Sequence, residues 1–570
     1  MFSVLFLAAA ILVGETPLAP TGGTVAALSP GQIGSRGATV TFVEHEAEQA
    51  RTTGQVIGPD RMFGTLPSEA SGRKAVLLRR AGDYVEFTLA RPANAITVRI
   101  AVPDSVDGRG LNSTIGLYAN GERLSSINTT SRYGWFYGTY PFSNRPADGH
   151  ARHFYDESRL LLARTLPAGS KVRLMKAAQD KADWYAIDLA DFELVPPPKT
   201  PPRGALSITT FGADPTGKRD SASAIERAIA TARRRGVAVW IPPGAFRADR
   251  HIIVDRVTIA GAGAWRSILR GNGVGLYGRR QPQGSRSVML RDFAIIGEVM
   301  ERVDKAQLAG IGGSIGGGSV VEDLWIQHHK VGLWIDGPID GLVIRRNRIV
   351  DHTADGLNLR GGVINALVEH NFVRNSGDDG LAMWSHQRLN RGNAFRNNTV
   401  IAPILANGIA IYGGADIDVS GNLVADTVTE GGGIHLGNRF DAEPLAGRIE
   451  LHDNLVVRAG SYDPNWKFGV GALWFYALDH PITALITVRN AEIVDSTLPA
   501  LHFIGKPITG VAFDNVRIRG TGSDPVQIQS AGAARFKAVV ASETTPGVPI
   551  CDRRFRVIDE GQNSGWETRC

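Results

Sequence analysis

The chain has 570 residues, of which 43% are hydrophobic and 21% are charged, a composition typical of a soluble protein with more than one domain. Its 62 basic and 56 acidic side chains leave a net charge of +6, which raises the question of nucleic-acid binding. The one compact basic run, Arg233 to Arg235, follows alanine and isoleucine at helical spacing and indicates a solvated helix face. We therefore expect a monomer with no nucleic-acid or membrane partner and no cofactor for catalysis.

Both ends of the chain indicate export. The opening stretch MFSVLFLAAAILVG is too short to span a bilayer but suits the apolar region of a signal peptide. It predicts a signal peptide over residues 1–24 and a secreted or periplasmic protein. The two cysteines, Cys551 and Cys570, both lie near the C-terminus, and they predict one disulfide in a tail over residues 546–570.

The stretch PPPKTPPRG, residues 196–204, predicts a stiff linker between two domains. Upstream, residues 30–195 contain short segments of alternating polarity separated by turns, such as DYVEFTLA and AITVRIAV. This pattern predicts a β-sandwich of jelly-roll type.

Downstream, two motifs repeat with nearly the same period. A glycine followed by an apolar-x-apolar step recurs at intervals of 24, 24, 28 and 25 residues, at Gly332, Gly356, Gly380, Gly408 and Gly433. An asparagine followed by an apolar step recurs in parallel, at Asn347, Asn371, Asn398, Asn422 and Asn454. Short strands with this period and no helices between them predict an all-β domain, a right-handed parallel β-helix over residues 205–545 with an inward asparagine ladder.

The start of this domain resembles the first coil of pectate-lyase-superfamily β-helices. The similar segments are GADPTG, a following helix that would cap the open end, and WIPPG. The resemblance implies the fold but not the reaction, because that superfamily includes lyases, hydrolases, epimerases and phage tailspikes.

Three aspartates stand out from the repeat. Asp355 and Asp379 each precede a repeat glycine, and they are 24 residues, or one coil, apart. They should stack about 4.8 Å apart, a repulsive arrangement that stability alone does not favour. Asp378 adds a third carboxylate at the same bend. Turn chemistry and a calcium site are possible explanations, but acid and base groups for glycoside hydrolysis explain the set best.

The segments TADGLNL and SGDDGLAM resemble the catalytic steps of β-helical glycoside hydrolases, including the polygalacturonases. Those enzymes carry a histidine, and then an arginine and a lysine that clamp a uronate, where this chain has Asn407, His435 and Gly437. The missing clamp favours a neutral polysaccharide as substrate.

The chain more closely resembles glycoside hydrolase family 87, the α-1,3-glucanases and mycodextranases, in which a lone aspartate and an aspartate pair have the same spacing. The resemblance implies inverting hydrolysis of α-1,3-glucosidic bonds in α-1,3-glucan or nigeran. Asp378 would be the general acid, and Asp355 and Asp379 would activate water. A polysaccharide lyase, a polygalacturonase-like enzyme acting on a uronic glycan and a non-catalytic glycan-binding β-helix stay open as alternatives.

Polar and aromatic residues near the aspartates are candidates for sugar contacts, because an aromatic ring offers an apolar face with a polar edge. Alternate strand residues also point inward, so each candidate has a structural alternative. The candidates are Trp334, Asn358, Trp384, His386, Arg388, Asn407, Tyr412, His435 and Trp474.

The N-terminal domain resembles carbohydrate-binding modules of family 35 in the segments TFVEHEAEQA and IDLADFELVPPP. The resemblance implies a structural Ca²⁺ held by Glu46, Glu48 and Asp191, an all-oxygen ligand set that suits calcium. The alternative is a solvated strand with alternating charges.

Overall fold

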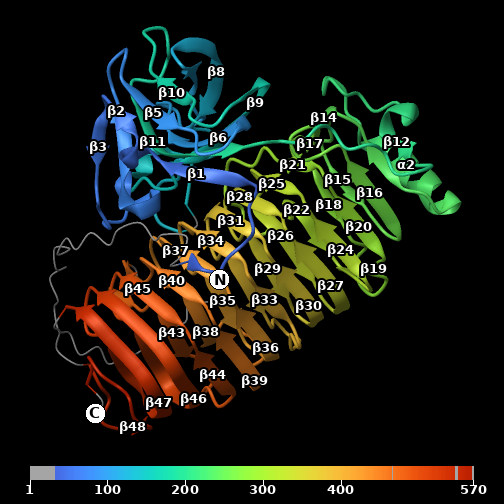
Figure 1. The fold of residues 1–570 in the computed structure, drawn as a ribbon. Helices are drawn as coiled ribbons and strands as arrows, with labels where there is room; N and C mark the ends of the chain where they lie inside the picture. Colours follow the sequence, from blue (N-terminus) through green and yellow to red (C-terminus); the bar gives the residue numbers. More distant parts are fainter. Residues whose placement is uncertain (1–32, 141, 465–466, 546–549, 568–570) are drawn as a thin grey trace.

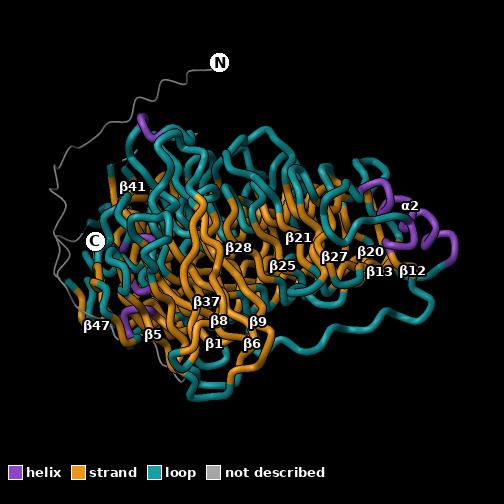
Figure 2. The backbone as a smooth tube through the Cα atoms, turned by 90° about the horizontal axis from the view of Figure 1, so that it is seen from above, coloured by secondary structure: helices purple, strands orange, loops and turns teal. Residues whose placement is uncertain are grey.

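The computed structural model describes residues 33–140, 142–464, 467–545 and 550–567. A β-sandwich lies against one side of a long parallel β-helix (Figure 1). Between the two domains, the predicted linker over residues 196–204 runs without helix or strand to β12 (Leu206–Ser207) (Figure 2). Within the described ranges, no helix is long and apolar enough to cross a membrane. The all-β fold and the parallel β-helix predicted from the sequence are confirmed.

The N-terminal domain consists of two antiparallel sheets that enclose an apolar core including Val98, Ile115 and Leu174. One sheet has the order β3 (Gln55–Ile57), β4 (Ala75–Leu78), β11 (Tyr185–Glu193), β6 (Ala93–Ala101), β9 (Asp156–Leu166), with β1 (Phe42–Glu46) paired to β11. The other has the order β2 (Arg51–Thr52), β5 (Tyr84–Thr88), β10 (Lys171–Met175), β7 (Asn112–Ala119), β8 (Glu122–Thr130).

In the β-helix, each coil places one strand in each of three parallel rows. The first row contains β13 (Val239–Ile241), β16 (Val257–Gly261), β20 (Val288–Arg291), β24 (Ser319–Glu322), β27 (Ile339–Arg345), β30 (Val363–Glu369), β33 (Ala394–Arg396), β36 (Gly414–Ser420), β39 (Leu445–His452) and β44 (Leu485–Arg489). The second row contains β14 (Gly244–Arg247), β17 (Ser267–Arg270), β21 (Ala294–Ile296), β25 (Trp325–Gln327), β28 (Arg348–His352), β31 (Phe372–Ser376), β34 (Thr399–Ile401), β37 (Leu423–Ala425), β40 (Leu455–Val457) and β45 (Glu492–Ser496). The third row contains β15 (His251–Ile253), β18 (Gly275–Tyr277), β22 (Ala309–Gly313), β26 (Val331–Asp336), β29 (Leu357–Arg360), β32 (Leu381–Trp384), β35 (Ile409–Tyr412), β38 (Ile434–Asn438) and β43 (Leu473–Ala477).

The last coils are continuous. The long strands β46 (Leu501–Thr521) and β47 (Val526–Thr544) pair in parallel, and β48 (Phe555–Asp559), in the segment predicted as a tail, extends the same sheet. Two small strand pairs project from the coils: β19 (Ser285–Arg286) with β23 (Ile315–Gly316), and β41 (Ser461–Asp463) with β42 (Phe468–Val470). Cys551 forms an isolated parallel β-bridge with Ile528 through its backbone. Cys570 and the predicted signal peptide lie outside the described residues, so the disulfide and the signal peptide stay predictions.

The helix α2 (Ala222–Arg235) covers the N-terminal end of the β-helix, as the pectate-lyase resemblance implies (Figures 1 and 2). Its alanines and isoleucines are buried in the same core as the coils, while the three arginines of its last turn occupy the solvent side. The helix ends at Gly236, whose φ of 64° is the left-handed conformation that glycine adopts readily.

The predicted asparagine ladder is present in the interior of the coils. From Asn347 to Asn454, each side-chain amide donates to the carboxamide oxygen of the next asparagine at 2.9–3.1 Å. Each amide also donates to a backbone carbonyl of the preceding turn, as Asn371 does to Ile344 at 3.0 Å. The ladder therefore satisfies buried backbone groups at a bend where no strand pairing is available.

A buried arginine connects the two domains. Arg374, on β31, donates to Glu157 at 2.5 Å, to Glu44 at 2.8 Å and to Asp191 at 2.7 Å, and these three acids belong to the sandwich strands β9, β1 and β11. The Arg374 side chain is 0% exposed. Two or more carboxylates around one guanidinium satisfy its planar donor fork, so the charge can be buried between domains.

One oxygen of the predicted calcium ligand Asp191 is paired with Arg374, and its other oxygen is buried with no hydrogen-bond partner in the described part of the chain. Glu46 and Glu48 do lie together, but the acid beside them is Asp188. Asp188 accepts from the Ser71 amide at 2.9 Å and also pairs with an arginine. The sequence did not separate the two acids, because both lie in the apolar stretch YAIDLADFEL.

We predict that Arg374→Met destabilises the protein by about 3–5 kcal/mol, because it leaves several buried carboxylates without their cation. Denaturant unfolding of the full chain measures this change. The matched control is Arg391→Ala, which removes an exposed ion pair with Asp416 and should cost less than about 1 kcal/mol. Equal losses for the two variants would contradict the role of Arg374.

Candidate active site

The three aspartates form one compact cluster at the bend between the second and third rows. Asp355 lies between β28 and β29, and Asp378 and Asp379 lie one coil later, between β31 and β32. One oxygen of each carboxylate lies within 4.8 Å of the others. Asp355 and Asp379 are buried, whereas the side chain of Asp378 is 21% exposed. The stacking predicted from the 24-residue step therefore occurs.

The glycines after these aspartates are needed for coil packing. A Cβ at Gly356 would lie 2.4 Å from the carbonyl oxygen of Gly380, and a Cβ at Gly380 would lie 2.3 Å from a methyl group of Val400. Any other residue would clash with the next coil. Packing thus explains the repeated glycine, but it does not explain the acid that precedes it.

Hydrogen bonds fix the two buried carboxylates. One oxygen of Asp379 accepts from the backbone and side-chain amides of Asn407, both at 2.9 Å, and the other accepts from the Tyr412 hydroxyl at 2.8 Å. Asp355 accepts from the Asn358 amide at 2.8 Å. Three predicted substrate-binding residues therefore bond the aspartates in this structure.

Burial and mutual repulsion disfavour negative charge in the cluster. Burial, followed by repulsion from Asp378, raises the pKa of Asp379 to about 7, although the bonds from Asn407 and Tyr412 act in the opposite direction. Burial and the two neighbouring aspartates also raise the pKa of Asp355 well above its usual value. A pair of carboxyls with raised pKa values can exchange a proton near neutral pH, as acid–base catalysis requires.

Arg302 is a member of the site that the sequence analysis missed. It lies in the loop between β21 and β22, with its side chain 7% exposed, and it donates to Asp378 at 2.5 Å. The same guanidinium donates to Asp304 at 2.9 Å. No periodic motif marks this loop, so the sequence offered no signal for its proximity to the cluster.

Two of the predicted sugar-contacting residues are interior. His435 and Trp474 are both 0% exposed and stack on each other with ring centroids 3.9 Å apart. The Trp474 indole donates to the Asn407 side chain at 2.8 Å, so it supports the residue that holds Asp379. The prediction of direct sugar contact is wrong for this pair, because both side chains are fully buried, with Tyr412 packed on His435 and Tyr476 on Trp474.

The other aromatic candidates lie at the surface of the third row. Trp384 is half-buried, stacks near His386 with centroids 4.3 Å apart and donates to the Phe440 carbonyl at 2.9 Å. Trp334 is half-buried two coils earlier, with its indole bonded to Asp336. Arg388 is exposed.

Small outward residues separate these aromatic rings. In the register of the third row, Gly312, Trp334, Asn358, Ala382 and Ala410 follow one another on successive coils. Ala382 and Ala410 are small but 0% exposed, because they pack with Trp384, Tyr412 and Ala442. The third row beside the triad is therefore covered at these two positions.

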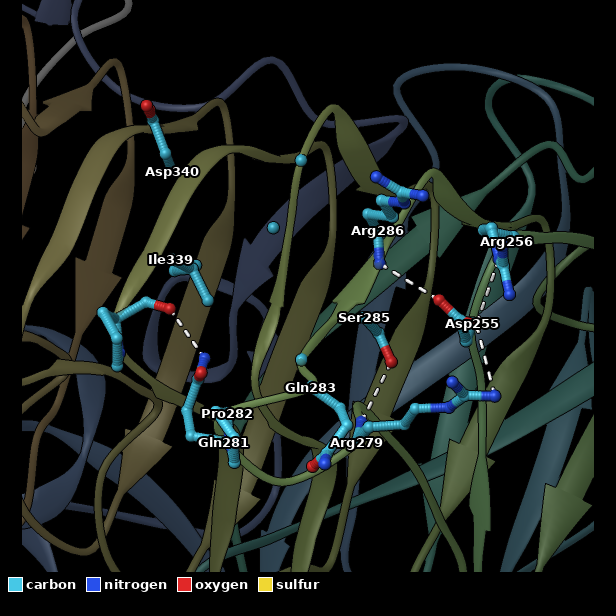
Figure 3. A pocket seen from close by; sticks show the side chains of 14 residues that line it. Asp255, Arg256, Arg279, Gln281, Pro282, Gln283, Ser285, Arg286, Ile339 and Asp340 are labelled. Atoms are coloured by element: carbon cyan, nitrogen blue, oxygen red, sulfur yellow. Dashed lines mark hydrogen bonds and ion pairs between the residues drawn. The ribbon is translucent and has the colours of Figure 1, made fainter.

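A surface hollow lies elsewhere on the β-helix. It has a volume of about 430 Å³ and is lined by residues including Arg256, Arg279, Arg286 and Asp340 (Figure 3). Asp255 lies in its wall and forms ion pairs with Arg256 and Arg279. The hollow does not include the aspartate cluster, so it is not a candidate for the reaction.

The predicted calcium ligands do not form a ready cluster. Within the described ranges, the acid and histidine groups close enough to share an ion are the cluster of Asp355, Asp378 and Asp379 and a buried set of Asp156, His328 and Asp351 at the domain interface. Neither group includes Glu46 or Glu48.

Comparison with known proteins identifies the family. Models of the α-1,3-glucanase catalytic domains D1 and D2 match residues 39–195 and 218–445. The catalytic unit of a thermostable family 87 α-1,3-glucanase from Streptomyces thermodiastaticus is 43% identical, with a TM-score of 0.86 over 94% of this chain and 98% of that chain. The chain belongs to glycoside hydrolase family 87. No curated protein matches its sequence.

A second structure, the catalytic domain of a family 87 α-1,3-glucanase in complex with nigerose, is 25% identical and covers 93% of this chain and 100% of its own, with a TM-score of 0.82. Three single aspartate-to-alanine variants of a family 87 α-1,3-glucanase were solved with nigerose or tetrasaccharides. Their substituted aspartates are separated by 23 residues and then by one, the spacing of Asp355, Asp378 and Asp379. The chain is thus a glycoside hydrolase of this family, with the family's two-domain catalytic unit.

We predict that Asp379→Asn becomes more stable relative to the wild type as pH rises. The folded protein keeps Asp379 protonated up to about pH 7, whereas an unfolded aspartate releases its proton near pH 3.9. The folded state therefore binds more protons between these values, and this carboxyl's contribution to stability, present below about pH 4, is lost as pH rises through about 7. Asparagine cannot ionise and escapes this loss.

Thermal unfolding of both proteins at about pH 4 and about pH 8 measures the effect. The comparison at the lower pH is the internal control, because there the folded wild type is also uncharged at this position. A melting-temperature difference that stays constant with pH would contradict the raised pKa.

Proposed function

We propose that this chain is a secreted, inverting hydrolase of α-1,3-glucosidic bonds in a neutral polysaccharide, α-1,3-glucan or nigeran. The main support is the cluster of three carboxylates, each with an oxygen within 4.8 Å of the others, with the half-buried ring of Trp384 on the strand that follows the aspartate pair. The nigerose and tetrasaccharide bound by relatives support α-linked glucose as the substrate unit.

A neutral substrate agrees with the charges around the cluster. At the coil where polygalacturonases carry their uronate clamp, His435 is buried against Trp474, and its pKa is lowered well below the usual value by burial. That histidine is neutral and inaccessible. The cation nearest the aspartates, Arg302, is already shared between Asp378 and Asp304.

Asp355 and Asp379 are suited to activate one water together. Two acceptor oxygens within 4.8 Å can both receive hydrogen bonds from a single water, because each such bond is about 2.8 Å long. Loss of a proton from this water is favoured when at least one of the two carboxyls is ionised. The raised pKa of Asp379, about 7, makes it an effective base near neutral pH.

Asp378 is suited to protonate the glycosidic oxygen. It is the exposed member of the set, at 21%, so it can meet a substrate that the buried pair cannot reach. Inverting enzymes keep roughly 6.5–9.5 Å between the acid and base carboxyls, whereas the 4.8 Å limit here applies only to the nearest oxygen of each group. Inversion therefore requires the Asp378 oxygen that faces the substrate, and not the one nearest the pair, to donate the proton.

We predict that Asp355→Asn, Asp378→Asn and Asp379→Asn each keep the fold and lower turnover by at least about 10²-fold, the low end for acid–base catalysis. Reducing-sugar release from α-1,3-glucan measures turnover, and circular dichroism checks the fold. Asp340→Asn, a surface change in β27, is the matched control and should leave turnover unchanged. An unsaturated product would instead identify a lyase.

Proton NMR of the first-formed anomer tests the stereochemistry of the same reaction. Attack by water on an α-linkage with inversion gives the β-anomer first. A fresh α-anomer would contradict the shared-water mechanism even if α-1,3-glucan were the substrate.

We also propose a structural calcium ion at Glu46 and Glu48. The Oε2 atoms of both are buried and have no hydrogen-bond partner in the described part of the chain, and calcium prefers carboxylate oxygens. The Oδ1 atom of Asp191 is likewise buried and without a partner in the described ranges, while its Oδ2 pairs with Arg374.

Binding of an ion to the folded state alone stabilises it, so we predict that a chelator lowers the melting temperature of the wild type. The Glu46→Gln variant should melt lower than the wild type and lose this response. A wild-type melting curve that is unchanged by chelator would exclude the ion.

A further inference from the structure

We propose that the N-terminal sandwich takes part in catalysis by positioning Asp378, through contacts from Tyr140 to Asp304 and from there to Arg302. The inference rests on the proposed role of Asp378 as the general acid. It makes two residues positioning residues of the reaction: Arg302, in a loop of the β-helix, and Tyr140, on the domain whose sequence resembles a carbohydrate-binding module.

All three nitrogens of the Arg302 guanidinium make contacts at this site. One terminal nitrogen donates to Asp378 at 2.5 Å, the other lies 3.3 Å from the Gly377 carbonyl, and Nε donates to Asp304 at 2.9 Å. The guanidinium thus contacts the catalytic carboxylate and the backbone just before it. Two contacts on one short segment fix the direction of a side chain better than one does.

The loop that carries Arg302 has little structure of its own. Between β21 and β22, residues 297–308 contain only turns and bends. On the β-helix side, the Lys330 side chain donates to the Asp304 carbonyl at 2.8 Å, and backbone bonds to the neighbouring coil hold the loop at Gly297, Val299 and Leu308. These contacts act on the backbone and do not set the orientation of the Asp304 and Arg302 side chains.

The sandwich supplies the remaining support. The Tyr140 hydroxyl donates to the Asp304 carboxylate, and the Tyr140 ring lies 5.2 Å from the Arg302 guanidinium in cation–π geometry. Asn144 donates to the Met300 carbonyl at 2.9 Å, and Arg132 contacts the Met300 sulfur at 3.4 Å. One segment of the sandwich, residues 132–144 without the undescribed residue 141, therefore holds the loop at both its backbone and its charged side chains.

The charges keep this contact chain intact at neutral pH. Burial and the bond to Asp304 raise the pKa of Tyr140 to about 12, so its hydroxyl remains a donor. Asp378 and Asp304 keep Arg302 positively charged despite its burial. The Arg302 cation therefore remains available to both Asp378 and Asp304, and hydrogen bonds from a charged donor are the stronger class.

Asp378 needs this support more than the other two aspartates do. Asp355 and Asp379 are buried and bonded to residues of their own coils. The Asp378 side chain is partly exposed, and its ion pair with Arg302 comes from a different loop. Without that partner, the carboxyl can turn toward solvent, and small misplacements of a reacting group can cost about 10²-fold in rate.

The experiment compares kcat and KM of the full-length protein on soluble α-1,3-linked glucose oligomers. Tyr140→Phe removes only the hydroxyl of a half-exposed side chain and should lower kcat about 10-fold, the value of one hydrogen bond to a charged group, with KM changed less than about twofold. Arg302→Met should lower kcat about 10²-fold, and Arg302→Lys should recover part of this loss because it keeps the charge.

Tyr118→Phe is the matched control, because it lies near the far end of β7 from the 132–144 segment and should leave both constants unchanged. Unfolding midpoints of all variants show whether a loss reflects folding. A normal kcat in Tyr140→Phe, or a rise in KM alone, would overturn the inference while leaving the proposed reaction intact. A wild-type protein that does not cleave the oligomers would contradict the proposed function itself.

Discussion

Parallel stacking of coils at one fixed spacing is the constraint on which the site depends. Inward leucines such as Leu357 and Leu381 lie directly over one another, and the asparagine ladder fixes the same register at the bend. Once the coils are in this register, Asp355 and Asp379 must lie side by side. The core thus stabilises an arrangement of carboxylates that their own repulsion opposes.

The neighbours of the aspartates offset that repulsion in different ways. Asp379 receives three hydrogen bonds from Asn407 and Tyr412, which are themselves held by coils further along. Asp378 instead receives a cation from a loop outside the repeat. Residues of the β-helix coils therefore hold the buried carboxyls of Asp355 and Asp379. The more exposed carboxyl of Asp378 depends instead on a loop outside the repeat.

This division explains how much the sequence could predict. The repeat period was enough for the β-helix, the asparagine ladder and the stacked aspartates, because periodic residues must meet in neighbouring coils. It gave no information on Arg302 or Tyr140, since loop conformation and domain contact leave no periodic signal. The burial of Trp474 was also missed, because the alternation of residues along a strand does not show whether an outward-facing ring is covered in the folded chain.

The interface between the two domains also depends on charged side chains that no repeat organises. Its centre is polar, with Arg374 set among acids from three sandwich strands. Such pairs add little net stability compared with apolar contacts, but they are costly to misalign. An interface of this kind specifies one orientation of the sandwich, and that orientation brings the 132–144 segment to the loop of Arg302.

The packing of the repeat glycines has a consequence for how such enzymes can diversify. Each glycine is required by the coil above it, but the residue before it varies, and that position holds Val331, Asp355, Asp379 and Asn407 on successive coils. The variation ends one coil later at Gly432, where a Cβ would lie 2.1 Å from the Gly471 carbonyl oxygen. The β-helix therefore has a row of equivalent positions, one on each coil, at which the side chain can change while the packing of the coils stays the same. Exchange of single side chains along this row can move a reactive centre by one coil, and so alter how many sugar units lie on each side of the cut, without redesign of the core.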